Sequence, residues 1–260
     1  MAPALGFYGK LPALGDFVQR GLAAGFVAPW DGWLAGVMGG AGAAFGADWQ
    51  RHYEQSPAWR FLLAPGCIDH QTWIGLMVPS VDRVGRRFPL TLAMPHPGGL
   101  DAVATLAGAG AWFDALEALA HDALDGLLGL DALEAALAAL PAPPLVVAEP
   151  DATRPFRPRP DVAALALTDG AGRARLAAEV AGWHRPLSLF ACTDPLRLLA
   201  AELLPASALA LALFDGRFGA HGWRVDDGAA PAPGPAAAAR AAPAAIDADA
   251  TRALPLAAAR

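Results

Sequence analysis

A lysine and an aspartate stand among three glycines in GFYGKLPALGDF, residues 6–17, a combination of residue types that could bind phosphate. A Walker loop needs four residues between its first glycine and a Gly-Lys pair, then serine or threonine to hold magnesium. Here only two residues separate Gly6 from Gly9, and a leucine follows Lys10. No G-x-G-x-x-G is present either. The spacing therefore excludes the familiar phosphate-binding loops.

Serine chemistry would depend on one arrangement, Ser80 followed by Asp82 in VPSVDRVGRRFP. No serine of the chain lies in the G-x-S-x-G turn that exposes a nucleophile in α/β-hydrolases. A triad would also need a histidine that folding brings close. The alternative, which we favour, is that both side chains satisfy backbone groups in a turn between two strands.

Candidate metal ligands are scattered along the chain. The histidines form no H-E-x-x-H and the cysteines no C-x-x-C. The one local group is Cys67, Asp69 and His70 in CIDH, which we interpret as a polar turn. Cys67 and Cys192 are far apart and make no disulfide framework, so they indicate two small buried residues. We expect no metal and no cofactor.

Three arginines, Arg83, Arg86 and Arg87, surround Gly85 in a chain whose net charge is -6. Guanidinium groups suit carboxylate and phosphate partners, so this turn could bind an acidic or phosphorylated protein. The acidic balance itself disfavours nucleic acid as a partner. The internal alternative is pairing with a carboxylate of the same chain, that of Asp16, Asp69 or Asp82.

Hydrophobic spacing predicts the elements that would position these residues. Pro29 can sit in the first turn of a helix, and the glycines of GGAGAAFG (39–46) would weaken or end that helix, because each costs about 1 kcal/mol. A second short helix follows and is closed by Pro57. Aromatic and branched residues predict strands in three runs, at 59–64, 72–79 and 88–94.

The second half of the chain alternates in the same way. We expect an amphipathic helix at 111–128, a helix from an Asp131–Glu134 capping box to Pro141, a strand at 144–149, and two apolar runs, 186–192 and 209–215, around a helix near 195–204. This alternation predicts an α/β fold with a central mixed or antiparallel sheet flanked by helices in three layers.

Composition divides the chain into two parts. Residues 1–227 are expected to form one α/β domain, with a proline-rich linker or long loop at 151–161. The tail, 228–260, is rich in alanine and proline and has no aromatic residue, so we expect it to be disordered. The amino terminus lacks the features of a secretory signal, and no apolar run reaches the length of a membrane span. We therefore expect a cytoplasmic protein without direct membrane insertion.

Four uncommon motifs occur in order within residues 5–95: GFYGKLPALGDF, FVAPWDGWL, WRFLLAPG and WIGLMVPSVDRVGRRFPLTLA. Together they resemble the TagF family of type VI secretion-associated proteins, also called ImpM. The resemblance implies an α/β fold and a non-enzymatic regulator that represses the apparatus after translation. Family members are linked to the forkhead-associated scaffold protein of the threonine-phosphorylation pathway, and some are fused to a protein phosphatase domain.

The resemblance transfers no catalytic residue. Its characteristic positions map onto Gly6, Phe7, Gly9, Lys10, Pro12, Gly15, Asp16, Phe17, Trp30, Asp31, Trp33, Pro79, Ser80, Asp82, Arg83, Gly85, Arg86, Phe88 and Pro89. The chain departs from the family at Leu14, where arginine is common, and at 188–190, where SLF stands in place of a Ser-x-Trp-Trp element. The downstream half therefore follows the family loosely.

The leading hypothesis is a regulatory adaptor that binds the forkhead-associated scaffold or another component of the secretion apparatus. We expect its contact surface to include Lys10, Asp16, Asp82, Arg83, Arg86 and Arg87. The glycines and prolines of residues 6–17 would shape a strand exit and a tight turn, with Lys10 and Asp16 pairing locally or facing a partner. The alternatives are a hydrolase or phosphatase-like enzyme using Ser80 or Asp82, and a structural component of the apparatus.

Overall fold

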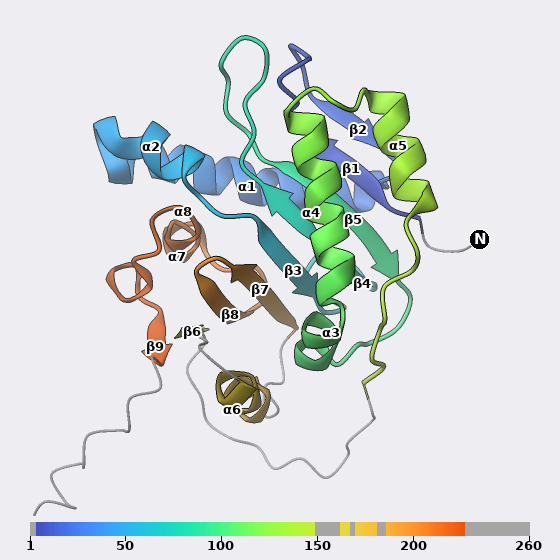
Figure 1. Cartoon of the computed structure of the whole chain (residues 1–260). Coiled ribbons are helices and arrows are strands. Elements are labelled where there is room, and N and C mark those ends of the chain that lie inside the picture. Colours follow the sequence, from blue (N-terminus) through green and yellow to red (C-terminus); the bar gives the residue numbers. More distant parts are fainter. Residues whose placement is uncertain (1–3, 149–161, 167–169, 181–185, 227–260) are drawn as a thin grey trace, which may run out of the picture. The chain divides into compact units, whose positions relative to one another are not determined.

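A nine-stranded sheet of order β2-β1-β5-β4-β3-β7-β8-β6-β9 forms the centre of this computed structural model (Figure 1). The structure describes residues 4–148, 162–166, 170–180 and 186–226. The strands are β1 Gly6–Gly9, β2 Val18–Arg20, β3 Trp59–Leu63, β4 Thr72–Val78, β5 Leu90–His96, β6 Val162–Ala166, β7 Leu187–Thr193, β8 Leu196–Glu202 and β9 Arg224–Asp226. Neighbouring strands are antiparallel except for β6 and β9, which are parallel, so the sheet is mixed.

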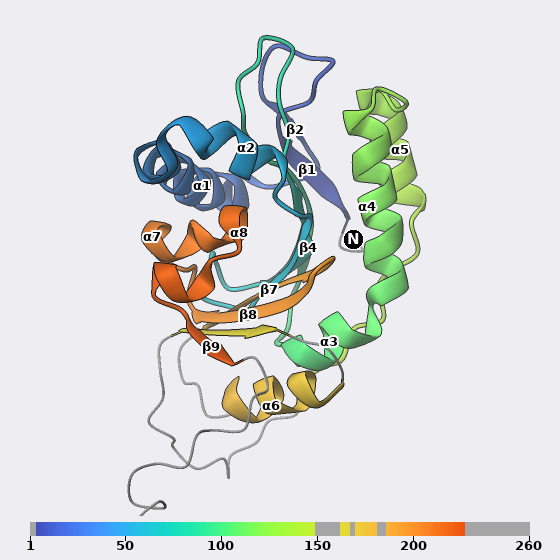
Figure 2. The same ribbon diagram turned by 60° about the vertical axis from the view of Figure 1, so that its left-hand side comes forward.

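Helices cover both faces of this sheet, which gives the three layers predicted from the sequence (Figure 2). One face carries α1 Ala24–Phe45, α2 Trp49–Glu54, α7 Ser207–Ala210 and α8 Ala212–Asp215. The other face carries α3 Ala102–Gly108, α4 Gly110–Leu124, α5 Leu130–Ala139 and α6 Gly170–Val180. Short 3-10 turns at Gly46–Asp48 and Phe218–His221 complete the described elements.

Side chains of the central strands alternate between two cores. On β4, Trp73 and Met77 pack under α1, whereas Ile74, Leu76 and Val78 pack under α4. Strands buried on both faces have near-continuous apolar sequences, and the runs at 59–64, 72–79 and 88–94 are indeed β3, β4 and β5. The amphipathic helix expected at 111–128 is α4.

The first helix differs from the prediction at both ends. α1 begins at Ala24, so Pro29 lies inside it, and it continues through the glycines to Phe45. The inward face supplies the reason, because Val37, Ala41 and Phe45 are buried in the aromatic core. This tertiary packing outweighs the low helix propensity of glycine. The short helix before Pro57 is α2, as predicted.

The expected capping box at Asp131 and Glu134 is wrong. The residue before α5 is Gly129, and Asp131 lies in the first turn of the helix. Both carboxylates instead contact Arg20 of β2, at 3.0 Å from Asp131 and 2.6 Å from Glu134. Asp131 and Glu134 therefore form surface ion pairs with β2 instead of capping the amino terminus of α5.

The helix predicted near residues 195–204 is wrong. Residues 196–202 form strand β8 rather than a helix, and the apolar run at 209–215 lies in α7 and α8. β8 pairs with β7 on one side and β6 on the other, and its central side chains are buried on both faces of the sheet, Leu199 and Ala201 in one core and Leu198 and Ala200 in another. Of the run expected as a strand at 144–149, the described residues 144–148 form an isolated bridge, between Val147 and Leu100, and no named strand.

Two expectations fall on residues outside the described ranges. These are the proline-rich linker or long loop at 151–161 and the tail at 228–260. In the part of the chain that is described, no single helix has both the length and the hydropathy needed to cross a membrane. The pair α3 and α4 passes the same test only when taken together, with a bend of 69° between its members.

Candidate functional site

Two loops project side by side from one end of the sheet, beyond β1 and β2 and beyond β4 and β5 (Figure 1). We call this region the tip and define it as residues 10–17 and 79–89. The two loops meet because β1 pairs with β5 in antiparallel register, Tyr8 opposite Thr91. The end of β1 therefore lies beside the start of β5, and each loop leaves the sheet at the same place.

A buried ion pair joins the two loops. Lys10 Nζ donates to Asp82 Oδ2 at 2.6 Å, and the two side chains are 4% and 0% exposed. Asp82 also accepts hydrogen bonds from the backbone N–H groups of Val84 and Arg86 and from Arg86 Nε. Burial alone would raise the pKa of the Asp82 carboxyl, but these hydrogen bonds outweigh it and hold that pKa well below its usual range.

Ser80, in the second loop of the tip, forms hydrogen bonds with both the first loop and helix α2. Its hydroxyl donates to the carbonyl oxygen of Lys10 at 2.7 Å. Tyr53 of α2 donates its hydroxyl proton to the Ser80 carbonyl and accepts from the Ser80 N–H, both at 2.8 Å. Burial raises the pKa of Tyr53, so its hydroxyl keeps the proton that it donates. Helix α2 is thereby anchored to the second loop of the tip.

The three arginines of the second loop have different environments. Arg86 donates to Asp82 and to the carbonyl oxygen of Gly15, and Arg87 pairs with Glu54 at 2.6 Å. The backbone N–H of Arg83 donates to the Leu14 carbonyl at 2.8 Å. Its guanidinium makes no hydrogen bond or ion pair with any described residue. Arg86 thus has one of the expected internal partners, Asp82, whereas Arg87 pairs with a carboxylate that was not expected, that of Glu54.

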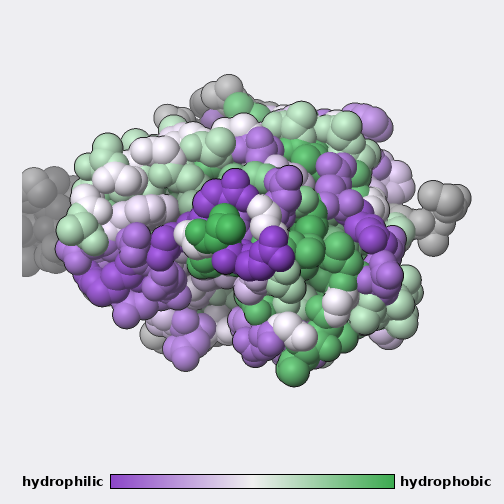
Figure 3. Space-filling view, turned by 90° about the horizontal axis from the view of Figure 1, so that it is seen from above, coloured by the Kyte–Doolittle hydropathy of each residue, from purple (hydrophilic) through white to green (hydrophobic). Residues whose placement is uncertain are grey.

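Apolar side chains stand next to these arginines at the surface. Val84 is 65% exposed and Phe17 is 43% exposed. Phe17 stacks on Tyr8 and meets Phe88 edge to face, with ring centroids 5.6 and 4.9 Å apart. Viewed along the tip, Figure 3 shows a small hydrophobic area near the centre of the face, bordered by hydrophilic groups. The tip therefore presents apolar and cationic groups together.

Asp16 does not pair with Lys10, which corrects one of the two arrangements expected for them. The carboxylate of Asp16 accepts from the backbone N–H of Phe17 at 2.8 Å and is exposed. Lys10 is instead turned inward, with its ammonium group 4.8 Å from the centre of the Phe17 ring. The loop curves in this way because Gly9 adopts a φ of +141°, where a side chain would lie 2.1 Å from the Pro89 carbonyl oxygen.

Comparison with known families assigns the chain. The model of the TagF N-terminal domain, described as type VI secretion system-associated, matches residues 6–140. The chain belongs to this family. Among solved structures, PA0076 from Pseudomonas aeruginosa PAO1 superposes with a TM-score of 0.68 at 35% sequence identity. The match covers 82% of this chain and 95% of that one. No curated protein sequence matches.

Several residues of the TagF motifs make hydrogen bonds that require their particular side chains. Asp31 of α1 accepts from Tyr8 at 2.5 Å, and the Trp30 indole donates to Thr91 at 2.9 Å. Trp33 donates to the Pro205 carbonyl at 2.8 Å, which links α1 to the segment before α7. The remaining motif residues, Gly6, Phe7, Pro12, Pro79, Gly85, Phe88 and Pro89, lie in β1 or in the two loops of the tip.

The geometry does not support the enzyme alternative at Ser80 and Asp82. The Ser80 hydroxyl is buried and donates its proton to a carbonyl, so it has no base to activate it. No histidine in the described ranges hydrogen-bonds to either residue. At the CIDH turn, Asp69 accepts from the Trp73 indole, and burial raises the pKa of Cys67 to about 12. Among the described residues, no three metal-ligating side chains are grouped together.

Sequence reasoning missed two residues of this site, Tyr53 and Glu54. They are consecutive at the end of α2 and hold Ser80 and Arg87. One signal was available, because the chain has only two tyrosines, Tyr8 and Tyr53, and both donate hydrogen bonds at or beside the tip. Sequence spacing could not show that Tyr53 and Glu54 contact Ser80 and Arg87, because these partners lie in a loop far from α2 in the sequence.

Proposed function

We propose that this TagF family member is a repressor of type VI secretion that acts after translation, in the cytoplasm, by binding another protein through its tip. The forkhead-associated scaffold of the same secretion cluster is the partner we propose first. The proposal includes no catalytic step. It takes the family assignment as its starting point and the arrangement of the tip as its local support.

The observation that carries the proposal is the contrast between the inside and the outside of the tip. Lys10, Ser80 and Asp82 are each bound to other parts of the chain and hold the two loops in one conformation. Arg83 and Val84, at the turn of the second loop, are exposed to solvent. A rigid loop that presents a cation and an apolar side chain loses little entropy on binding, which favours a protein contact.

The residues expected at the contact surface would therefore contribute to binding in two ways, by direct contact or by positioning the loops. Arg83, Arg86 and Asp16 would reach a partner directly, because their side chains are exposed. Lys10 and Asp82 would act by positioning, because their side chains are buried under the second loop. Arg87 would contribute less, since it is half-buried and its guanidinium pairs with Glu54.

A titration of the purified chain with the scaffold tests the proposal, with the scaffold both phosphorylated and unphosphorylated on threonine. We expect saturable binding at micromolar concentration or below, about -8 kcal/mol. Arg83→Ala should weaken binding about tenfold, because it removes a charge-assisted contact. Arg51→Ala is the matched control, since Arg51 lies on α2, is exposed and, among the described residues, forms an ion pair with Asp48 alone.

Two results would contradict parts of the proposal. Equal affinity of Arg83→Ala and the unchanged chain would remove the tip as the contact surface. Absence of binding in both phosphorylation states would exclude this scaffold and direct the same titration to other components of the apparatus.

A further inference from the structure

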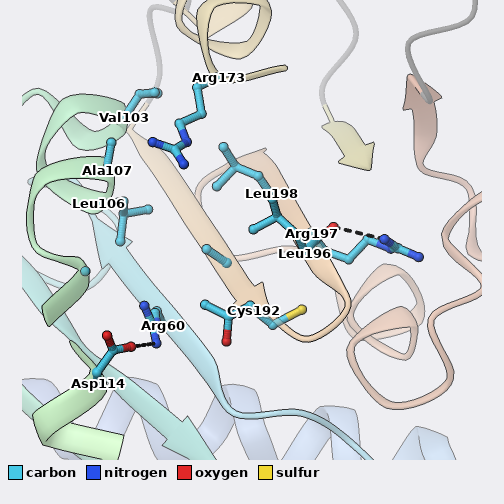
Figure 4. Close-up of a pocket in the computed structure, with 13 residues that line it drawn as sticks. Arg60, Val103, Leu106, Ala107, Asp114, Arg173, Cys192, Leu196, Arg197 and Leu198 are labelled. Carbon is cyan, nitrogen blue, oxygen red and sulfur yellow. Dashed lines mark hydrogen bonds and ion pairs between the residues drawn. The ribbon is translucent and has the colours of Figure 1, made fainter. Parts of the chain in front are cut away.

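A pocket of about 300 Å³ lies on the sheet face covered by α3, α4 and α6 (Figure 4). Its walls are largely apolar and include Val103 and Leu106 of α3 and Leu196 and Leu198 of β8. Ligand pockets in proteins start at about this size and combine apolar walls with a few polar groups. The pocket is separate from the tip and shares no residue with it.

Arg60 of β3 forms one polar wall of this pocket. Its side chain is 9% exposed, and only Nη2 is hydrogen-bonded, to Asp114 at 2.6 Å and to Glu117 at 3.3 Å. The donors on Nε and Nη1 have no acceptor among the described residues. They are not sealed in, because the only enclosed and unpaired side-chain nitrogen or oxygen found in the described residues is Trp112 Nε1. Arg60 therefore keeps free donors at a largely buried position.

Arg173 of α6 supplies the second cation. Its side chain extends from the helix toward the pocket, opposite the wall that carries Arg60 (Figure 4). It makes no ion pair or hydrogen bond with the rest of the described chain. Its neighbour Arg175, two residues further on the same helix, pairs with Asp226 at 3.3 Å. An arginine without an internal partner at the edge of an apolar pocket is a ready binding group for an anion.

The pocket holds one cation, that of Arg173, which pairs with no described carboxylate, although the chain as a whole carries -6. Asp114 is the only carboxylate among the residues that line it, and its side chain is 69% exposed. Arg197 also belongs to the lining, but its guanidinium turns away and donates to the Leu196 carbonyl (Figure 4). Arg60 is thus balanced by Asp114 and by Glu117, which lies outside the lining, and contributes its free N–H donors, whereas Arg173 contributes the charge.

We propose that this pocket binds an amphipathic oxyanion, with a carboxylate or phosphate head group at Arg60 and Arg173 and an apolar tail of several carbons between α3 and β8. Guanidinium groups bind both kinds of head group through charge-assisted hydrogen bonds. The apolar walls exclude water from the tail, which adds the hydrophobic contribution. This inference does not depend on the proposed regulatory function.

Octanoate, octyl phosphate and octanol are suitable probes, titrated separately into the full chain and followed by calorimetry or ligand-observed NMR. The two anions share an eight-carbon tail with octanol, so the comparison isolates the head group. We expect saturable binding of at least one anion, about tenfold or more tighter than octanol. The stronger of the two anions identifies the head group that the site prefers.

Variants locate the site. Arg173→Ala should weaken anion binding about tenfold, and Arg175→Ala, on the same helix but paired outside the pocket, should leave it unchanged. Ala107→Phe should abolish binding by filling the cavity, and Ala107 is exposed on α3, so the fold should tolerate the change. Arg60 is avoided because it is largely buried among carboxylates.

Three results would overturn the inference: no saturable binding of either anion at millimolar concentration, equal affinity for octanol, or equal effects of Arg173→Ala and Arg175→Ala. None of these results bears on scaffold binding at the tip, so the two proposals succeed or fail separately.

Discussion

Lys10 and Asp82 are 72 positions apart in the sequence and form a buried ion pair of 2.6 Å. The pair closes the contact between the loop that follows β1 and the loop that precedes β5. Asp82 also receives the backbone N–H groups of its own turn, so one carboxylate fixes both the turn and its attachment to the neighbouring loop. The position of the exposed Arg83 therefore depends on two side chains that do not reach the surface.

Lys10→Met should destabilise the protein clearly. It keeps the length of the side chain but removes the buried ammonium partner of the Asp82 carboxylate, which then has only Arg86 as a cationic partner, and losing one partner of a buried ion pair is costly. We expect the midpoint of thermal unfolding to fall by roughly 5 °C or more. Arg87→Met removes a half-buried arginine that pairs with Glu54 at the edge of the tip, and should have a smaller effect. Equal effects of the two variants would show that the buried pair is not important for stability.

The same carboxylate should make stability dependent on acid pH. Its hydrogen bonds hold the pKa of Asp82 below the value in the unfolded chain, so on acidification the unfolded chain takes up the proton first. The stabilisation is complete above the ordinary carboxyl range, about pH 4, and is lost as pH falls below it. Asp215, whose pKa is also lowered by His221 and Arg217 against the effect of burial, contributes in the same direction.

Urea unfolding of the unchanged chain and of Asp82→Asn at neutral pH and at about pH 3 measures the contribution of Asp82. The difference between the two proteins should be larger at neutral pH than at acid pH. Asp131→Asn, which removes an exposed surface carboxylate, provides the control. A difference that is the same at both pH values would rule out Asp82 as a source of the acid sensitivity.

Tyr53→Phe should cost about 2 kcal/mol of unfolding free energy, because it leaves the N–H of buried Ser80 without its partner and removes one of the two hydrogen bonds to the Ser80 carbonyl, which keeps only the one from the Phe88 N–H. Tyr8→Phe is the natural comparison and should cost about 1 kcal/mol, since its hydroxyl makes one hydrogen bond, to Asp31 at a partly exposed site. Urea titrations with unchanged slope give both values. If Tyr8→Phe proves the more costly, α2 is not anchored through Ser80 in the way described.

The fold class was predictable because the central strands carry continuous apolar runs. The segments at 59–64, 72–79 and 88–94 are buried on both faces, and flanking prolines and glycines mark their ends. β8 was not predictable in the same way. Its leucines, alanines, arginine and glutamate all favour helix, and only the pairing with β7 and β6 makes the segment a strand.

The candidate site was predictable in its residues but not in its contacts. Lys10, Ser80, Asp82 and Arg86 were identified from their motifs, and the structure brings all four together. For Lys10 the sequence left two alternatives, local pairing with Asp16 or contact with a partner protein, because sequence spacing shows only local neighbours. The antiparallel pairing of β1 with β5, which creates the long-range contact, depends on the topology of the whole sheet.

Replacing Gly75 and Gly39 by alanine should change the stability of the protein in opposite directions. Gly75 lies in the middle of β4, where a Cβ atom would be 2.2 Å from the Leu92 carbonyl oxygen and 2.7 Å from the Phe61 ring. Gly39 lies inside α1, where nothing would stand within 4 Å of the added carbon. Gly75→Ala should therefore destabilise the protein by about 3 kcal/mol or more through overpacking. Gly39→Ala should stabilise it by about 1 kcal/mol, because alanine has the higher helix propensity.

Both effects can be measured by urea unfolding of the single variants. The result for Gly39→Ala also bears on the sequence prediction that the helix weakens in this segment. A gain in stability means that the helix persists in solution as far as the buried Phe45 and that the glycines only reduce its stability. No gain would indicate that this part of α1 is not helical in solution, because alanine then has no propensity advantage to contribute.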